Sequence, residues 1–252
     1  MNVEENEQTK TVYLYAKIPY NIIVGKDQNY RRTLLYAMMY LYMPLIGETI
    51  LHRDYVYTKC NMYIDKHYWK EYYSDLLEWF ERSGYILLEW IDKSKKSARV
   101  EKKDALECDG ISERYGSIFY YEIQDICNVN YGNLCRNKVN QAHVILVLAY
   151  VRCSMTFKEG FFVHGCYNHI SNISEDIGLS DAIILKCIEY LERLNILKVK
   201  KLKRFMHDGC WKTNYTVFTN AKDIYNDANY GDEEINKIIK YIEYRKEIVY
   251  SM

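Results

Sequence analysis

The sequence predicts a mainly helical α+β protein built from two similar units and a C-terminal helix. Three observations support this fold class: a helical segment occurs twice with the same apolar spacing, a long apolar helix precedes each copy, and a basic stretch follows each copy. A repeat of this kind indicates how many similar units a chain contains. We therefore expect a flexible tail at 1–10, a first unit at 11–107, a second at 118–222 and the helix at 229–252.

Length and composition agree with two folded units. The chain has 252 residues, 49% of them apolar and 27% charged, which is typical of globular domains and is enough for two of ordinary size. Only the first ten residues, "MNVEENEQTK", are too polar to fold. We expect each of the two units to bury a core of its own.

The repeat has an offset of 111 positions and no gap. It aligns "LEWFERSGYI" at Leu77–Ile86 with "IEYLERLNIL" at Ile188–Leu197. Equal apolar spacing predicts that Leu77, Phe80 and Ile86 take the core positions of Ile188, Leu191 and Leu197. Upstream, each copy has a strand that enters a turn, "YAKIPYNII" at Tyr15–Ile23 and "YYEIQDICN" at Tyr120–Asn128. The apolar helices then follow, as "RRTLLYAMMYLYMPLI" and "NQAHVILVLAYVRCSM".

The second copy contains the signals of a helix-turn-helix. Ser174 is a candidate cap for a short helix that ends at Gly178, and Leu179 turns the chain. Ser180 then caps a second helix, which Asp181 stabilises at its N-terminus. The basic run "KVKKLKR" and the alternating "NYTVFT" are the expected strands of a hairpin that turns at Gly209.

The segment from Asn140 to Thr219 resembles a winged helix-turn-helix. It has the I-x-x-x-x-G-L-S turn, a third helix closing on L-x-x-L-x-I-L and a two-stranded wing that ends in N-Y-x-V. The first copy, 13–103, matches less well, because "TILHRDYVYTKCNMYIDKHY" has no Gly-Leu-Ser turn. The tandem arrangement opening on "KIPYNI" is similar to the winged-helix replication initiators of plasmids and other mobile elements. It is also similar to the replisome organisers of phages.

This resemblance implies sequence-specific binding of double-stranded DNA without catalysis, in replication initiation or partition of a plasmid, phage or integrated mobile element. A transcriptional regulator and a scaffold that recruits other replication proteins are the alternatives. The 34 basic and 34 acidic residues balance, so cationic patches matter more than net charge. Six cations against one anion lie in Lys93–Lys103, and five cations with no anion lie in Lys198–Arg204. The expected partners are duplex DNA, a second copy in a homodimer and other replication proteins.

In a winged helix, the third helix enters the major groove while the wing lies along the phosphates. The candidates on or near the helices are Lys59, Lys66, His67, Lys70 and Tyr72 in the first unit, and Ser180, Asp181, Ile183 and Lys186 in the second. Those on the wings are Lys93, Lys95, Lys96 and Arg99, then Lys198, Lys200, Lys201, Lys203 and Arg204. The positions of the second helix that should face a groove, which also include Glu189, have one cation and lack the Arg, Asn or Gln residues that read guanine and adenine. We expect better sequence discrimination from the first unit, and protein contact remains the alternative role of the second helix.

Enzymatic and metal-binding motifs are missing from the sequence. It has no glycine-rich phosphate loop, no G-x-S-x-G and no H-E-x-x-H, so we expect no enzyme and no cofactor. His164, Cys166 and His169, with His207 and Cys210, are the nearest group to a zinc site, but structural roles are commoner and we expect no metal. The eight cysteines form no C-x-x-C pair, which favours reduced thiols over a disulfide framework.

The longest apolar run, "AHVILVLAYV", is about half the length that spans a bilayer, and no N-terminal stretch combines a basic start with an apolar run, so we expect a soluble cytoplasmic protein. The 27 tyrosines gather in clusters such as "YAMMYLYM" and "GSIFYYEI", which we interpret as edges of the core or a dimer surface. Near the C-terminus an isoleucine stripe predicts a helix that docks on its own domain or, as the alternative, on a second subunit. The stripe contains Ile235, Ile238, Ile239 and Ile242, and Ile248 or Val249 would extend it.

Overall fold

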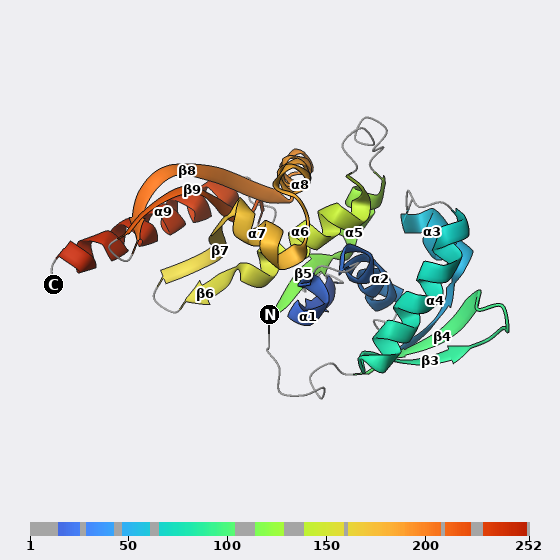
Figure 1. The fold of residues 1–252 in the computed structure, drawn as a ribbon. Coiled ribbons are helices and arrows are strands. Elements are labelled where there is room, and N and C mark those ends of the chain that lie inside the picture. Colours follow the sequence, from blue (N-terminus) through green and yellow to red (C-terminus); the bar gives the residue numbers. More distant parts are fainter. Residues whose placement is uncertain are drawn as a thin grey trace, which may run out of the picture.

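The protein is described by a computed structural model that covers residues 15–25, 29–42, 47–60, 66–103, 114–128, 139–158, 161–207, 210–222 and 229–250. Its helices and strands follow one another as two halves and a final helix (Figure 1). The first half consists of β1 (Tyr15–Pro19), α1 (Tyr20–Ile23), α2 (Asn29–Tyr42), β2 (Glu48–His52), α3 (Arg53–Cys60), α4 (Lys66–Arg82), β3 (Ile86–Trp90) and β4 (Ser97–Lys102). The second consists of β5 (Tyr115–Phe119), α5 (Tyr120–Asn128), α6 (Gln141–Ser154), β6 (Thr156–Lys158), β7 (Phe161–His169), α7 (Ile170–Ile177), α8 (Asp181–Arg193), β8 (Leu197–His207) and β9 (Cys210–Asn220), and α9 (Tyr230–Tyr250) ends the chain.

Both halves contain a small antiparallel sheet with the same connectivity. In the first half the strand order is β2-β4-β3, and in the second it is β6-β7-β9-β8. In each half, the strand before the helix pair, β2 or β7, pairs with the last strand, β4 or β9. The last strand also pairs with the strand that follows the helices, β3 or β8, and so lies between the two. The predicted α+β class is therefore confirmed, and the sheets are small and antiparallel.

The 111-residue repeat is visible in the backbone where α4 and α8 end. Gly84 and Asn195, 111 positions apart, both have positive φ angles, of 79° and 54°. The chain then turns back in the same way, since Tyr85 N donates to Phe80 O and Ile196 N donates to Leu191 O, each at 2.9 Å. The six predicted core residues are all buried: Leu77, Phe80, Ile86, Ile188, Leu191 and Leu197.

A two-stranded ribbon joins the halves. Strand β1 pairs antiparallel with β5, with Tyr15 opposite Phe119 and Pro19 opposite Tyr115. The prediction of a strand at Tyr120–Asn128 was therefore wrong, because the strand lies five residues earlier and that segment is helix α5. Gly116 is required in β5, since a Cβ atom there would lie 2.2 Å from the carbonyl oxygen of Ala149 in α6.

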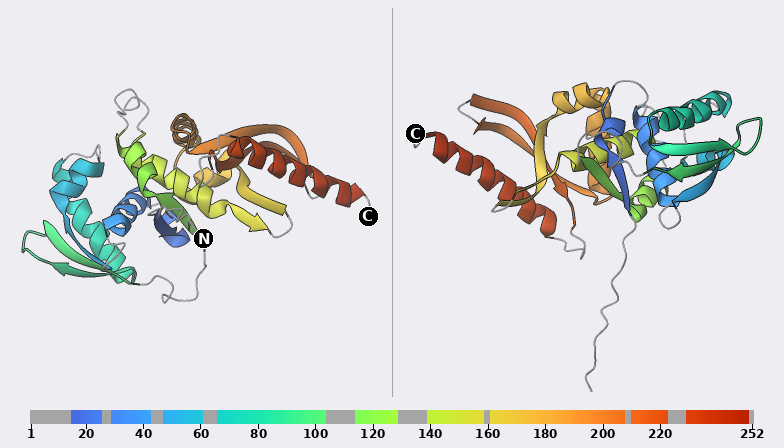
Figure 2. Two further views of the ribbon diagram at one scale, coloured as in Figure 1. Left: turned by 180° about the vertical axis from the view of Figure 1, so that it is seen from behind. Right: turned by 90° about the horizontal axis from the view of Figure 1, so that it is seen from below.

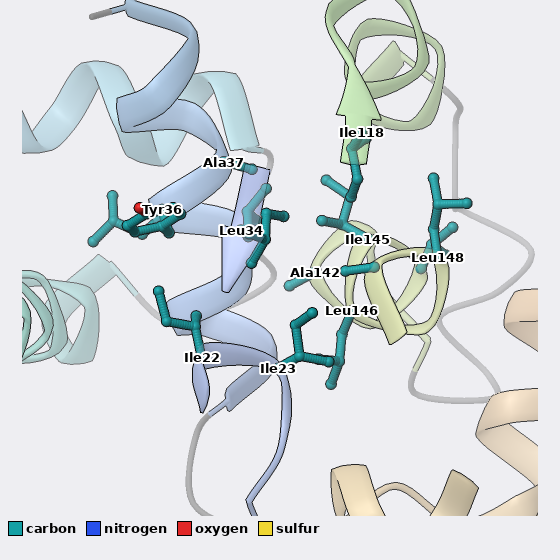
Figure 3. Close-up of a cluster of buried hydrophobic side chains, with 14 of the residues drawn as sticks. Ile22, Ile23, Leu34, Tyr36, Ala37, Ile118, Ala142, Ile145, Leu146 and Leu148 are labelled. Atoms are coloured by element: carbon teal, nitrogen blue, oxygen red, sulfur yellow. The ribbon is translucent and has the colours of Figure 1, made fainter. Parts of the chain in front are cut away.

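The two halves share one hydrophobic core, contrary to the expectation of two. Helices α2 and α6 pack against each other at its centre, and Figure 3 shows Leu34 and Ile23 of the first half facing Ile145 and Leu146 of α6. The continuous cluster of buried side chains extends from Ala16 to Phe218. Sequence spacing shows which face of a helix is buried, but not whether that face meets its own half or the other.

A buried ion pair fixes the ribbon to the second half. The Arg152 guanidinium of α6 donates two hydrogen bonds to the Glu122 carboxylate of α5. It also donates to Ser117 O of the ribbon, at 2.7 Å, and to Asn220 Oδ1 at the end of β9, at 3.1 Å. The Arg152 and Glu122 side chains are only 7% and 3% exposed. One guanidinium thus connects α5, α6, β5 and β9.

The turn between α7 and α8 differs in detail from its prediction. Helix α7 begins at Ile170, and its cap is His169, whose side chain accepts a bond from Ser171 N. Ser174 is therefore inside the helix, where its hydroxyl donates to Leu179 O at 2.6 Å. Gly178 ends α7 in the left-handed conformation, as predicted, with φ of 68°. Ser180 occupies the N-cap position of α8, but its side chain makes no capping hydrogen bond.

Helix α9 covers the outer face of the second sheet (Figure 2). Ile235, Ile238 and Ile242 are buried there and form a second small cluster with Val217 of β9. Ile239 is partly buried against the same cluster. Docking of the isoleucine stripe on its own half is therefore confirmed, while the tail at 1–10 and the side chains of Ile248 and Val249 lie outside the described residues.

Candidate nucleic-acid interface

The first hairpin, β3 and β4 with the loop 91–96, has a loop organised around one carboxylate. Asp92 accepts hydrogen bonds from the Ser94 hydroxyl, from Lys96 N at 3.1 Å and from Ser97 N at 2.7 Å. These bonds, that of Ser94 above all, hold the pKa of Asp92 well below its usual range. Lys95 takes a positive φ angle of 52° in this loop. Lys93 and Lys96 are therefore exposed on a loop of defined conformation.

The cations of the first hairpin fall into two groups. The ion pairs join Lys95 to Glu78 of α4, and Arg99 to Glu89 of β3. The ammonium groups of Lys93 and Lys96 are exposed and form no ion pair within the described parts of the chain. Phosphate contact by Lys93 and Lys96 would thus break no existing pair, which makes them the stronger candidates.

Helix α4 presents a cation near its N-terminus and acidic side chains further along. Lys70 is exposed, whereas Glu71 and Asp75 give the next part of the exposed surface the opposite charge. Tyr72 was predicted to face a groove, and contact of its ring with DNA stays a prediction. Its ring is half-buried and packed under the guanidinium of Arg31, 4.0 Å from the ring centroid, because the helix turns this position toward α2. The side chains of Lys59, Lys66 and His67 lie outside the described residues.

The exposed face of α8 is acidic and apolar in its N-terminal part. Asp181 is exposed at its first turn, and Leu185 is 39% exposed one turn later. The Lys186 ammonium, 3.0 Å from Glu189, forms an ion pair that lowers the pKa of the Glu189 carboxyl. Ile183 is half-buried against the core, so it is not the freely exposed side chain that base contact requires. Ser180 is exposed beside Asp181.

The second hairpin, β8 and β9, divides its lysines between two faces. Lys198 lies on the side of α9, where its ammonium is 3.0 Å from Asp232. Lys200 lies on the same face, opposite Val217, and Lys201 projects from the other face. Lys200 and Lys201 are both exposed, while the side chains of Lys203 and Arg204 fall outside the described residues.

Lys201 lies on the side of α8. Partial burial raises the pKa of Glu192 on that helix, and the charges of Lys201 and Lys198 act against this rise. The described lysines of this strand, Lys198, Lys200 and Lys201, therefore do not form a single phosphate-binding row. Strand alternation alone separates them, because successive side chains point to opposite faces.

The residues considered for a metal site have structural roles where they are described. The Cys166 thiol is buried and lies 3.6 Å from Val151 O, and His169 caps α7. In the described part of the chain, no three His, Cys, Asp or Glu side chains come together as ligands would. The thiols of Cys127, Cys153, Cys166 and Cys187 are free.

Neither a scan against protein-family models nor a search of curated proteins gives a match to this chain. Of the helices that the structure describes, none combines the length and the apolar character needed to cross a bilayer.

Proposed function

We propose that this chain is a tandem winged-helix protein that binds double-stranded DNA and has no catalytic role. The observation that carries the proposal is the repeated succession of two helices and a basic hairpin, α3-α4-β3-β4 and α7-α8-β8-β9. In both halves the strand before the helix pair lies beside the second hairpin strand. A helix next to a cationic hairpin has the parts needed to contact a groove and the flanking phosphates.

The first half is the stronger candidate for sequence discrimination. It combines the exposed Lys70 near the start of α4 with Lys93 and Lys96 in the adjacent hairpin loop. Residues in the first turns of a recognition helix are those that reach base edges. The acidic side chains of α4, from Glu71 onward, would then lie toward the rim of the contact.

The second half would add phosphate contacts through Lys200 and Lys201. The exposed surface of α8 supports a second candidate function for this helix, which is contact with another protein. Asp181 and Leu185 offer an anionic and apolar surface that repels phosphate and fits a basic, partly apolar partner. A scaffold role for α8 is compatible with DNA binding by the first half.

Replication initiation on a mobile element is the biological role we favour, because of the resemblance to tandem winged-helix initiators. A transcriptional regulator would use the same modules. An array of direct repeats beside the gene supports an initiator, and one palindrome at its own promoter supports a regulator.

The salt dependence of duplex binding tests the proposal. Each phosphate contact that is lost should reduce the slope of log affinity against log salt by about 0.9. Replacing Lys93 and Lys96 together with glutamine should therefore reduce it by about 1.8. The matched control replaces two exposed lysines far from the first hairpin in sequence, Lys222 and Lys240, with glutamine. Equal slopes in the two double variants would contradict the proposed interface.

A further inference from the structure

The ribbon of β1 and β5 has one buried face and one exposed aromatic face. Ala16, Ile18 and Ile118 are fully buried on the inner face. The register places Tyr15 beside Phe119, and Pro19 beside Tyr115, on the outer face. A two-stranded ribbon with exposed rings is unusual, because aromatic side chains of this size are normally buried on folding.

Three of the rings are in contact at one end of the ribbon, and Tyr115 lies at its other end. Tyr121 of α5 stacks on Phe119 with 5.6 Å between ring centroids and 13° between ring planes. Tyr15 lies edge-on to Phe119, with centroids 6.0 Å apart. Tyr15, Tyr115 and Tyr121 keep 41%, 44% and 48% of their surface exposed. We call Tyr15, Lys17, Tyr115, Phe119 and Tyr121 the ribbon platform.

The charge of the ribbon platform is positive. The Lys17 ammonium lies between two of its rings, 4.9 Å from the centroid of Tyr115 and 5.9 Å from that of Tyr15. Arg114 is exposed immediately before β5. The segments 15–20 and 114–121 contain no Asp or Glu.

We infer that the ribbon platform is a binding site for single-stranded nucleic acid. Unpaired bases stack on exposed aromatic rings, and lysine or arginine beside the rings holds the phosphates. Duplex DNA does not fit such a platform, since its bases are already stacked and their faces are covered. The site is separate from both basic hairpins, and its activity does not depend on the proposed duplex contact.

Three substitutions separate stacking from apolar contact. Tyr115→Leu keeps apolar bulk but removes the ring, whereas Tyr115→Phe keeps the ring. Tyr55→Leu is the matched control, because Tyr55 of α3 is 46% exposed and Tyr115 is 44% exposed. The probes are a fluorescent oligo-dT of about 15 nucleotides and an abasic strand of equal length and charge, with anisotropy as the readout.

Tyr115→Leu should bind oligo-dT about tenfold more weakly than the original chain, which is a typical effect of losing one stacking ring. Tyr115→Phe and Tyr55→Leu should keep its affinity, and the abasic strand should bind more weakly than oligo-dT. Equal binding of the two strands, or equal affinity of Tyr115→Leu and Tyr55→Leu, would overturn the inference.

A parallel titration with a duplex separates this inference from the proposed function. Loss of oligo-dT binding in Tyr115→Leu with duplex binding retained supports two separate sites. If the original chain binds oligo-dT but no duplex, the proposed function fails and the inference stands. If Tyr115→Leu instead dissociates a dimer in sedimentation experiments and leaves oligo-dT affinity unchanged, the platform is a protein interface and the inference fails.

Discussion

Replacing Arg152 with methionine should destabilise the chain more than any other single loss of an ion pair described above. The change leaves the Glu122 carboxylate, which is 3% exposed, with a hydrogen bond from Phe119 N at 2.9 Å but without its counter-ion. Ser117 O and Asn220 also lose their bonds to the guanidinium. Removing one partner of a buried pair typically costs about 3–5 kcal/mol, and we expect a loss in that range.

The assay is urea denaturation followed by far-ultraviolet circular dichroism, with the free energy of unfolding extrapolated to water. Arg193→Met is the matched control, because it removes an exposed pair with Glu189 one turn away in α8. Such surface pairs contribute about 0.3–0.5 kcal/mol. The double variant Arg152→Met and Glu122→Gln should be more stable than the sum of the single losses predicts, because it removes the unpaired charge. A cost for Arg152→Met similar to that of Arg193→Met would refute the role of this pair in fixing the ribbon to the second half.

Three further predictions concern the core. Gly116→Ala should lower the urea midpoint, because the added Cβ would lie 2.2 Å from Ala149 O and push β5 away from α6; an unchanged midpoint would show that the ribbon is not held there. Leu191→Asp should reduce amide hydrogen-exchange protection in both halves, since the core is continuous, and loss confined to the second half would indicate two cores. Burial raises the pKa of the Cys127 thiol from 9.0 to about 11, so its contribution to stability should be constant below pH 9 and fall as the pH rises toward 11. Urea midpoints across this range should fall less in Cys127→Ala, and an equal fall would contradict the assignment.

The sequence predicted those parts of the fold that depend on local spacing. Helix α6 was expected because its apolar residues are continuous, and the end of α7 was expected because Gly178 can adopt a positive φ angle. Leu77 and Leu191 were identified as core residues from helical periodicity alone. Local patterns determine local structure, so these predictions needed no knowledge of the partner segment.

The parts that were missed depend on contacts between distant segments. The pairing of β1 with β5 joins residues about 100 positions apart, and this made one core where two were expected. Tyr72 lies in a polar and aromatic stretch that suggested an exposed side chain, but its ring packs under the guanidinium of Arg31 from another helix. Lys198 belongs to a basic run, yet it pairs with Asp232 of α9. A period-two alternation in "YAKIP" and "YGSIF" was the available signal for the ribbon.

Selection from a random pool of DNA duplexes tests the central claim most directly. The original chain and the Lys70→Ala variant would each be incubated with the pool, and the bound sequences recovered over several rounds. A sequence-specific protein with two DNA-binding halves should enrich a motif, and loss of Lys70 should weaken that enrichment while nonspecific binding remains. If the original chain enriches no motif, and its duplex affinity at low salt is no higher than that of the Lys93 and Lys96 double variant, the tandem DNA-binding account is contradicted.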